Sequence, residues 1–138
     1  MCASPGYIAK NGLPNSPSEL VNHKIVMSST VSSTVDWKFV QDITVRVKPR
    51  LTVTSNDAAI EAVKNGIGIT RLLSYQIEND LVSGKLQTLL TEFEPPPLPI
   101  HVVHREGRYA SAKVRTFVDL IAAKLRSIQT LNNGNINN

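Results

Sequence analysis

Hydrophobic and polar residues alternate along Thr44–Thr54, with the sequence TVRVKPRLTVT. The apolar residues would all point to one side of a strand: Val45, Val47, Leu51 and Val53. A period of two is typical of a half-buried β-strand. Pro49 removes one backbone donor, so we expect this strand to lie at a sheet edge or to carry a bulge at that residue.

The period changes from that of a strand to that of a helix after Thr54. Ser55, Asn56 and Asp57 can accept hydrogen bonds from the free N–H groups of a first helical turn. The next apolar residues follow helical spacing: Ala59, Ile60, Ala62, Val63 and Ile67. Lys64–Gly66 is suited to end the helix, and Ile67–Arg71 is short and apolar, like a buried parallel strand. Residues 44–71 therefore predict a β-α-β unit around which the other elements are arranged.

The residues before this unit predict two short helices and two short strands. These are a helix from Ser4 to Gly12, a helix that begins with the capping-box pair Ser16 and Glu19, a buried strand over Lys24–Met27 and a strand over Asp36–Gln41. Leu20 and Val21 are expected to face the interior. Trp37 and Phe39 fall on one face of the last strand, and we expect them in the core rather than stacked on a ligand.

The residues after the unit predict a second group of elements. These are a helix over Leu72–Asp80, a short strand over Leu86–Leu90, an extended connector over Glu94–Pro99, a strand over Ile100–His104 and a final helix capped by Ser111. The final helix carries a one-sided apolar stripe: Val114, Phe117, Val118, Ile121, Leu125 and Ile128. The tail Asn132–Asn138 is almost all Asn and Gly, a composition typical of disorder.

The composition of the chain argues against several classes of protein. The 138 residues suit one domain, and the net charge of +4 comes from dispersed basic residues rather than a nucleic-acid-binding run. The single cysteine, Cys2, cannot form an internal disulfide, which fits a reducing cytoplasm. The chain has neither the roughly 18 consecutive apolar residues of a membrane span nor a signal-peptide pattern. We therefore expect a cytoplasmic protein.

No catalytic or metal-binding motif is recognisable in the sequence. The three histidines are scattered, and one cysteine rules out the usual zinc-finger spacings. Gly66-Ile67-Gly68 lacks a third glycine and ends a helix instead of starting one, so it is not a dinucleotide-binding fingerprint. We expect no enzyme activity, no metal and no cofactor.

Hydroxyl and amide side chains mark two loops that could bind a ligand. Ser28-Ser29-Thr30 follows a buried strand, and Ser55-Asn56 opens a helix. In open α/β sheets ligands bind beyond the carboxyl ends of parallel strands, and helix N-termini favour anions. A solvated loop and simple helix capping are the competing explanations. With Thr70 after the next strand, the candidate ligand-binding residues are Ser28, Ser29, Thr30, Ser55, Asn56 and Thr70. Arg71 could pair with a ligand carboxylate or be a structural surface residue.

Residues 47–86, VKPRLTVTSNDAAIEAVKNGIGITRLLSYQIENDLVSGKL, resemble the effector-binding domain of a LysR-type transcriptional regulator. The flanking segments ASPGYIAKNG and PPPLPIHVVHREGRYASAKVRTFVDLIAAKL agree with that family, so the resemblance runs from about Ala3 to Leu125. No single motif is diagnostic; the order and spacing of the segments carry the resemblance.

The resemblance implies a fold and its division. The fold would be α/β and periplasmic-binding-protein-like (type 2), a three-layer sandwich with a mixed sheet. Residues 1–94 would be mainly the second α/β subdomain, and 95–130 the returning crossover strand and C-terminal helix of the first subdomain. Residues 131–138 would be a disordered tail. In this family the loop at Ser28–Thr30 borders the effector cleft.

The function implied by the resemblance is regulatory. The chain would bind a small, polar or anionic effector and self-associate, as part of a DNA-binding regulator. It would meet promoter DNA only through the family's helix-turn-helix, which these 138 residues are expected to lack. The final helix, without its usual sheet, would pack on a second copy of the chain or on its own sheet. Two alternatives stay open: a truncated module that only oligomerises, and a solute-binding protein of related fold.

Overall fold

The computed structural model describes residues 1–30, 34–103 and 111–128. The chain divides into two compact units, Met1–Pro95 and Pro96–Asn138, which are described separately below. Whether these units correspond to the two subdomains implied by the sequence remains a prediction.

The first unit contains a mixed β-sheet built from short strands. β2 (Ile25–Ser28) runs parallel to β5 (Pro49–Val53), and Ile25 also pairs in parallel with Ile69. Thr70 pairs antiparallel with β1 (Cys2–Ala3), which pairs antiparallel with β6 (Gln87–Thr88). The order across the sheet is thus β5, β2, the Ile69–Thr70 segment, β1 and β6. The predicted mixed sheet is confirmed.

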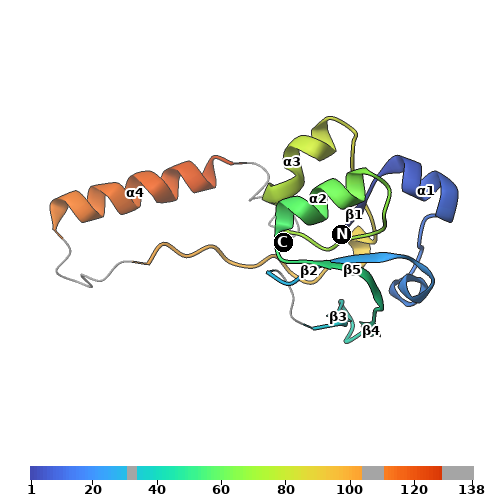
Figure 1. The fold of residues 1–138 in the computed structure, drawn as a ribbon. Helices are drawn as coiled ribbons and strands as arrows, with labels where there is room; N and C mark the ends of the chain where they lie inside the picture. The colour runs from blue at the N-terminus through green and yellow to red at the C-terminus, as the bar shows by residue number, and fades with distance from the viewer. Residues whose placement is uncertain (31–33, 104–110, 129–138) are drawn as a thin grey trace. The chain divides into compact units, whose positions relative to one another are not determined.

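The central β-α-β unit forms as the sequence predicts. α2 (Asn56–Lys64) begins at Ser55, whose Oγ accepts a hydrogen bond from the N–H of Ala58 at 3.5 Å. Its buried face packs across β1, β2 and β5, and Figure 1 shows α2 above β2 and β5 with the β3–β4 hairpin below. This face consists of Ala59, Ile60 and Val63. Apolar residues at helical spacing therefore hold the start of α2 beside the ends of the parallel strands.

Two glycines allow the chain to return from α2 to the sheet. Gly66 has a φ of 75°, a left-handed conformation that ends the helix. Gly68 lies against the neighbouring strand, because a Cβ there would be 2.2 Å from the carbonyl oxygen of Lys24. The next residue, Ile69, donates its N–H to that same oxygen at 2.8 Å. The Gly-Ile-Gly segment is thus a structural device for close strand pairing.

The long strand expected over residues 44–54 is interrupted. β4 (Thr44–Arg46) pairs with β3 (Asp36–Lys38) in an antiparallel hairpin, whereas β5 joins β2. Val47 is buried, but Leu51 is 36% exposed, so the prediction that it faces the core is wrong. The alternation fails because the two halves of the segment pair with different strands. The irregularity expected at Pro49 is present, since the register with β2 shifts between Ile25 and Val26.

The helices of the first unit agree with the sequence in place but not in every detail. They are α1 (Pro5–Asn11), the 3₁₀ helices η1 (Pro17–Asn22) and η2 (Thr91–Phe93), and α3 (Ser74–Val82). Ser4 and Ser16 precede helices as predicted, but neither side chain makes a capping hydrogen bond. Leu20 is buried and Val21 is 60% exposed, so the inward placement of Val21 is wrong. Neighbouring side chains on a 3₁₀ helix point about 120° apart, so the two cannot both face the core.

The core of the first unit holds the aromatic residues that the sequence assigned to it. Trp37 is 2% exposed and Phe39 is 6% exposed, which confirms that prediction. The strand predicted over Leu86–Leu90 is shorter than expected, being limited to Gln87–Thr88 of β6. Among the described residues, no helix has the length and apolar character needed to cross a membrane.

The second unit contains α4 (Ala112–Arg126). The Oγ of Ser111 accepts a hydrogen bond from the N–H of Val114 at 3.4 Å, so the predicted cap is confirmed. The strand predicted over Ile100–His104 is wrong for residues 100–103, which form no regular structure; His104 and the 132–138 tail lie outside the described residues. A strand needs a hydrogen-bonded neighbour, and residues 100–103 pair with no other strand among the described residues.

Candidate functional site

Five of the six predicted ligand-binding residues, all except Thr70, lie at the carboxyl ends of two parallel strands. Ser28 is the last residue of β2, and β5 leads directly to Ser55 and the N-terminus of α2. Because β2 and β5 run parallel, both strands end at the same edge of the sheet. This is the place where open α/β sheets present ligand sites.

Three of these residues form a hydrogen-bonded group, the Ser28–Thr30–Asn56 cluster. The Ser28 Oγ and the Thr30 Oγ1 each lie 2.6 Å from the Asn56 Oδ1. The two hydroxyl oxygens lie 2.7 Å from each other. The Asn56 Oδ1 carries no hydrogen, so only two hydroxyl hydrogens serve these three oxygen–oxygen contacts. At any moment one of the three contacts is therefore not a hydrogen bond, and an oxygen lone pair stays available as an acceptor.

The Asn56 amide supplies the donors of this cluster. Its Nδ2 carries two N–H bonds and makes no hydrogen bond with the described residues, although Asn56 is half-buried. Ser28 is 2% exposed, while Thr30 is exposed. The cluster therefore has a buried base and an accessible side whose amide donors bond to none of the described residues and can bind a polar oxygen of a small molecule.

Ser55 and Ser29 flank the cluster in different roles. Ser55 caps α2, and its acceptor is directed to the Ala58 N–H. The Ser29 N–H donates to the carbonyl oxygen of Val53 at 2.9 Å, which joins the loop to the end of β5. Asp57, in the first turn of α2, adds a negative charge that partly opposes the attraction of the helix N-terminus for anions.

Thr70 lies apart from the hydrogen-bonded cluster. It is fully buried, and its Oγ1 has no hydrogen-bond partner among the described residues. Its backbone exchanges two hydrogen bonds with Cys2, at 2.9 and 3.0 Å. Thr70 thus shares the sheet with Ser28, but no hydrogen bond joins its side chain to Ser28, Thr30 or Asn56.

Arg71 is held by the hairpin that carries Trp37 and Phe39. Its Nη1 donates to the carbonyl oxygen of Lys38 at 3.0 Å, and its guanidinium lies 5.6 Å from the centre of the Phe39 ring. Burial lowers the pKa of this arginine from its ordinary value. These contacts support the structural interpretation of Arg71 over pairing with a ligand carboxylate.

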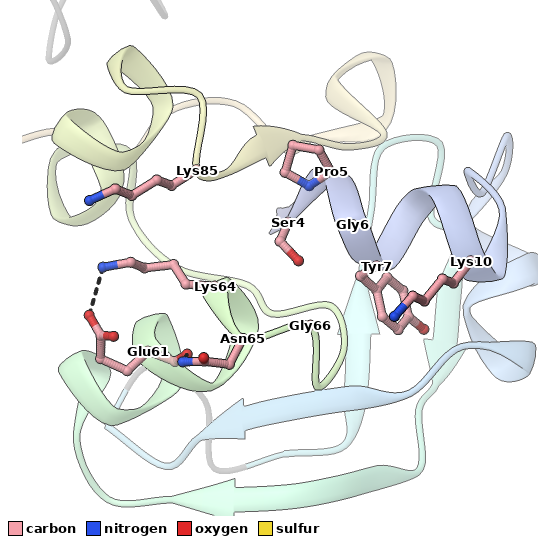
Figure 2. Close-up of a pocket in the computed structure, with 10 residues that line it drawn as sticks. All are labelled: Ser4, Pro5, Gly6, Tyr7, Lys10, Glu61, Lys64, Asn65, Gly66 and Lys85. Carbon is pink, nitrogen blue, oxygen red and sulfur yellow. Dashed lines mark hydrogen bonds and ion pairs between the residues drawn. The ribbon is translucent and has the colours of Figure 1, made fainter.

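A cavity of about 560 Å³ lies at the other end of α2, where the sequence analysis placed no site. Figure 2 shows the residues that line it: Ser4, Pro5, Gly6, Tyr7, Lys10, Glu61, Lys64, Asn65, Gly66 and Lys85. The Lys64 Nζ lies 2.7 Å from the Glu61 Oε1 and 3.3 Å from the Asp80 Oδ1. Three of the lining residues are lysines, namely Lys10, Lys64 and Lys85. They are far apart in the sequence, so no local motif could have revealed this cavity.

The described residues contain no group of three His, Cys, Asp or Glu side chains that could hold a metal ion. A mixed sheet with helix α2 packed on it, and a polar cluster at the carboxyl ends of its parallel strands, is the arrangement of an open α/β domain, the class of fold that presents ligand sites at this edge. The fold is that of the periplasmic-binding-protein-like regulatory domains.

The chain belongs to the LysR substrate binding domain family, whose sequence model matches residues 1–126. It is 32% identical over 122 residues to YcaN, an HTH-type transcriptional regulator of Escherichia coli K12, covering 88% of this chain and 40% of YcaN. It is 29% identical over 126 residues to the HTH-type transcriptional regulator CrgA of Neisseria meningitidis, covering 89% of this chain and 42% of CrgA. These relatives are transcriptional regulators, which agrees with the expectation that the chain is not an enzyme.

Solved structures give the same result. The regulatory domain of CrgA from Neisseria meningitidis superposes with a TM-score of 0.73 at 28% identity, covering 90% of this chain and 62% of that domain. The regulatory domain of AphB from Vibrio vulnificus, at 20% identity, shares the fold with a TM-score of 0.66 and covers 89% of this chain and 62% of its own. The chain therefore spans less than two thirds of the relatives and domains compared here.

Proposed function

We propose that this chain is the effector-binding part of a LysR-type transcriptional regulator and binds a small polar effector at the Ser28–Thr30–Asn56 cluster. The observation that carries the proposal is the meeting of these three side chains where β2 and β5 end. Membership of the LysR substrate binding domain family supports a ligand-binding role for this edge of the sheet.

The chemistry of the cluster favours an effector with oxygen acceptors. The Asn56 Nδ2 can donate to a carboxylate, carbonyl or hydroxyl oxygen, and the Ser28 and Thr30 hydroxyls can donate or accept. No charged side chain belongs to the hydrogen-bonded cluster, and Asp57 stands beside it. A neutral polar or singly anionic molecule therefore suits the site better than a strongly charged anion.

The regulatory role of the whole protein extends this proposal. Effector binding would shift the population between arrangements of a self-associating cytoplasmic regulator and so change how it holds promoter DNA. DNA contact would come from a helix-turn-helix domain of the kind named for YcaN and CrgA. Self-association would use the apolar stripe of α4, in which Phe117 is 61% exposed.

Thermal unfolding of the full chain against a panel of small carboxylates, amides and polyols tests the proposal. A ligand present at 100 times its Kd stabilises the folded state by about 2.7 kcal/mol, which raises the melting temperature measurably. The substitution Asn56→Ala removes the free donors and should abolish this rise. Asn79→Ala, on the exposed side of α3, is the matched control and should keep it.

Two results would contradict the proposal. One is a ligand-induced rise in melting temperature that persists in a folded Asn56→Ala variant. The other is the absence of any response across the panel together with assembly onto an intact regulator, which would support the alternative of an interaction module. Circular dichroism of each variant without ligand checks that it has folded.

A further inference from the structure

We propose that the cavity between α1, the end of α2 and Lys85 is a second ligand site, which binds a small anion carrying two or more charged oxygen groups. The site is separate from the Ser28–Thr30–Asn56 cluster. α2 has nine residues, with Asn56 at its first position and Lys64 at its last. At 1.5 Å of rise per residue the two sites lie about 12 Å apart along the helix axis.

Three lysines from different parts of the first unit line this cavity. Lys10 comes from α1, Lys64 from α2 and Lys85 from the segment between α3 and β6. In Figure 2 the ammonium groups of Lys64 and Lys85 lie on one side of the cavity, and that of Lys10 lies on the other. Neither Lys10 nor Lys85 makes an ion pair with the described residues. Lys10 and Lys85 thus bring two positive charges to the lining of the cavity that have no ion-pair partner among the described residues.

Ser4 provides a second, independent indication of a ligand. The residue is 5% exposed, and its Oγ makes no hydrogen bond with the described residues, not even as a cap for α1. Figure 2 shows this hydroxyl directed into the cavity. The backbone of Gly66 lies beside it, since a Cβ on Gly66 would be 3.8 Å from the Oγ. The hydroxyl of this largely buried residue is therefore open to the cavity, and an anionic oxygen there would accept its proton.

The balance of charge decides which anions suit the site. Glu61 and Asp80 both pair with Lys64, which leaves a net local charge of about +1 from three lysines and two carboxylates. The carbonyl end of the α2 dipole also disfavours anions. A singly charged ion gains little here. An anion with two charged groups offers a charged group to each of Lys10 and Lys85, and its oxygen can accept the Ser4 proton. A phosphate ester or a polycarboxylate has this chemistry.

Isothermal titration of the full chain with pyrophosphate and with citrate, at low and matched ionic strength, tests the inference. The double variant Lys10→Gln/Lys85→Gln leaves the Lys64 ion pairs in place and should weaken binding about tenfold or more. Ser4→Ala should weaken it about three- to tenfold. Lys48→Gln removes an exposed lysine that does not line the cavity and should leave the affinity unchanged.

The outcome separates a specific site from general attraction by a basic surface. Saturable binding of either probe, weakened by the double variant and by Ser4→Ala but not by Lys48→Gln, supports the inference. No saturable binding, or an equal loss with Lys48→Gln, overturns it. Ser28→Ala, in the other cluster, should leave the binding of both probes unaltered; a matching loss with that variant would show that they bind at the effector cluster instead.

Discussion

Thr70 places a hydroxyl group inside the sheet without a hydrogen-bond partner among the described residues. Because a buried unsatisfied hydroxyl costs about 1–3 kcal/mol, the nearly isosteric Thr70→Val should raise the free energy of unfolding by about 1 kcal/mol. Urea denaturation measures this change. Thr52→Val, at an exposed position of β5, serves as the control and should change stability little.

The same variant bears on the predicted ligand role of Thr70. If the hydroxyl binds the effector, Thr70→Val should lose the ligand-induced rise in melting temperature while the unliganded protein becomes more stable. A fall in unliganded stability would show that the hydroxyl has a structural partner, which contradicts its description as unsatisfied.

Cys2 gives a prediction about pH. Burial in the core raises the pKa of its thiol from 9.0 to about 11. A thiol whose pKa is higher in the folded protein than in the unfolded chain stabilises the folded state fully when the pH is below the pKa of the unfolded chain. This stabilisation is lost as the pH rises through the pKa of the folded protein. We expect the free energy of unfolding to fall by about 2–3 kcal/mol between roughly pH 9 and pH 11 through this group.

Cys2→Ala isolates this contribution from the other groups that titrate in alkali. The difference in the free energy of unfolding between the original protein and Cys2→Ala should change between roughly pH 9 and pH 11 and stay constant below pH 9. Iodoacetamide at pH 8 should modify the folded protein far more slowly than the urea-unfolded chain, because the buried thiol stays protonated. Equal rates would mean that Cys2 is accessible.

At the scale of elements, the turn from α2 into the sheet depends on Gly68. A Cβ there would be 2.2 Å from the Lys24 carbonyl oxygen and 2.8 Å from its carbonyl carbon, and both are backbone atoms of the residue that directly precedes β2. Gly68→Ala should therefore separate the segment from β2 and lower the free energy of unfolding by about 2–3 kcal/mol.

Gly6→Ala is the matched glycine variant for this test. A Cβ at Gly6, within α1, meets no atom within 4 Å. Because alanine is a better helix former than glycine, this variant should be as stable as the original or more stable by about 0.5–1 kcal/mol. Chemical denaturation measures the stability of both variants. An equal change in the two would contradict the expectation that Gly68 has no room for a Cβ.

At the scale of the whole molecule, the buried apolar residues that the structure describes all belong to the first unit. Among the described residues, the buried hydrophobic side chains lie between Met1 and Leu89, and none of the α4 residues is buried. The fragment Met1–Pro95 should therefore unfold cooperatively with a melting temperature within a few degrees of that of the full chain. Circular dichroism melting of both proteins tests this.

Sedimentation velocity on the same pair of proteins tests the role of the second unit. If α4 carries the self-association, the full chain should form dimers or larger assemblies while the fragment is monomeric. Phe117→Glu in the full chain should also give monomers, since a charge would interrupt the apolar stripe. A fragment that fails to fold would instead show that α4 completes the core.

The sequence alone determined the features that arise from local periodicity. Helical spacing in residues 59–63 and the acceptor Ser55 placed α2 correctly, and this prediction holds because it depends on side chains a few residues apart. The polar residues after the predicted parallel strands indicated the edge where Ser28 and Asn56 meet, and the family resemblance implied the mixed sheet.

Only the tertiary structure decided which distant residues come into contact. It divided the predicted long strand between two partners, left Leu51 and Val21 exposed, and brought Lys10, Lys64 and Lys85 around one cavity. Periodicity gives the face of an element but not the element that covers it, and the choice of partner depends on packing across the whole unit. For the same reason the Asn56 amide donors and the Ser4 and Thr70 hydroxyls, which have no hydrogen-bond partner among the described residues, could be recognised only in the fold.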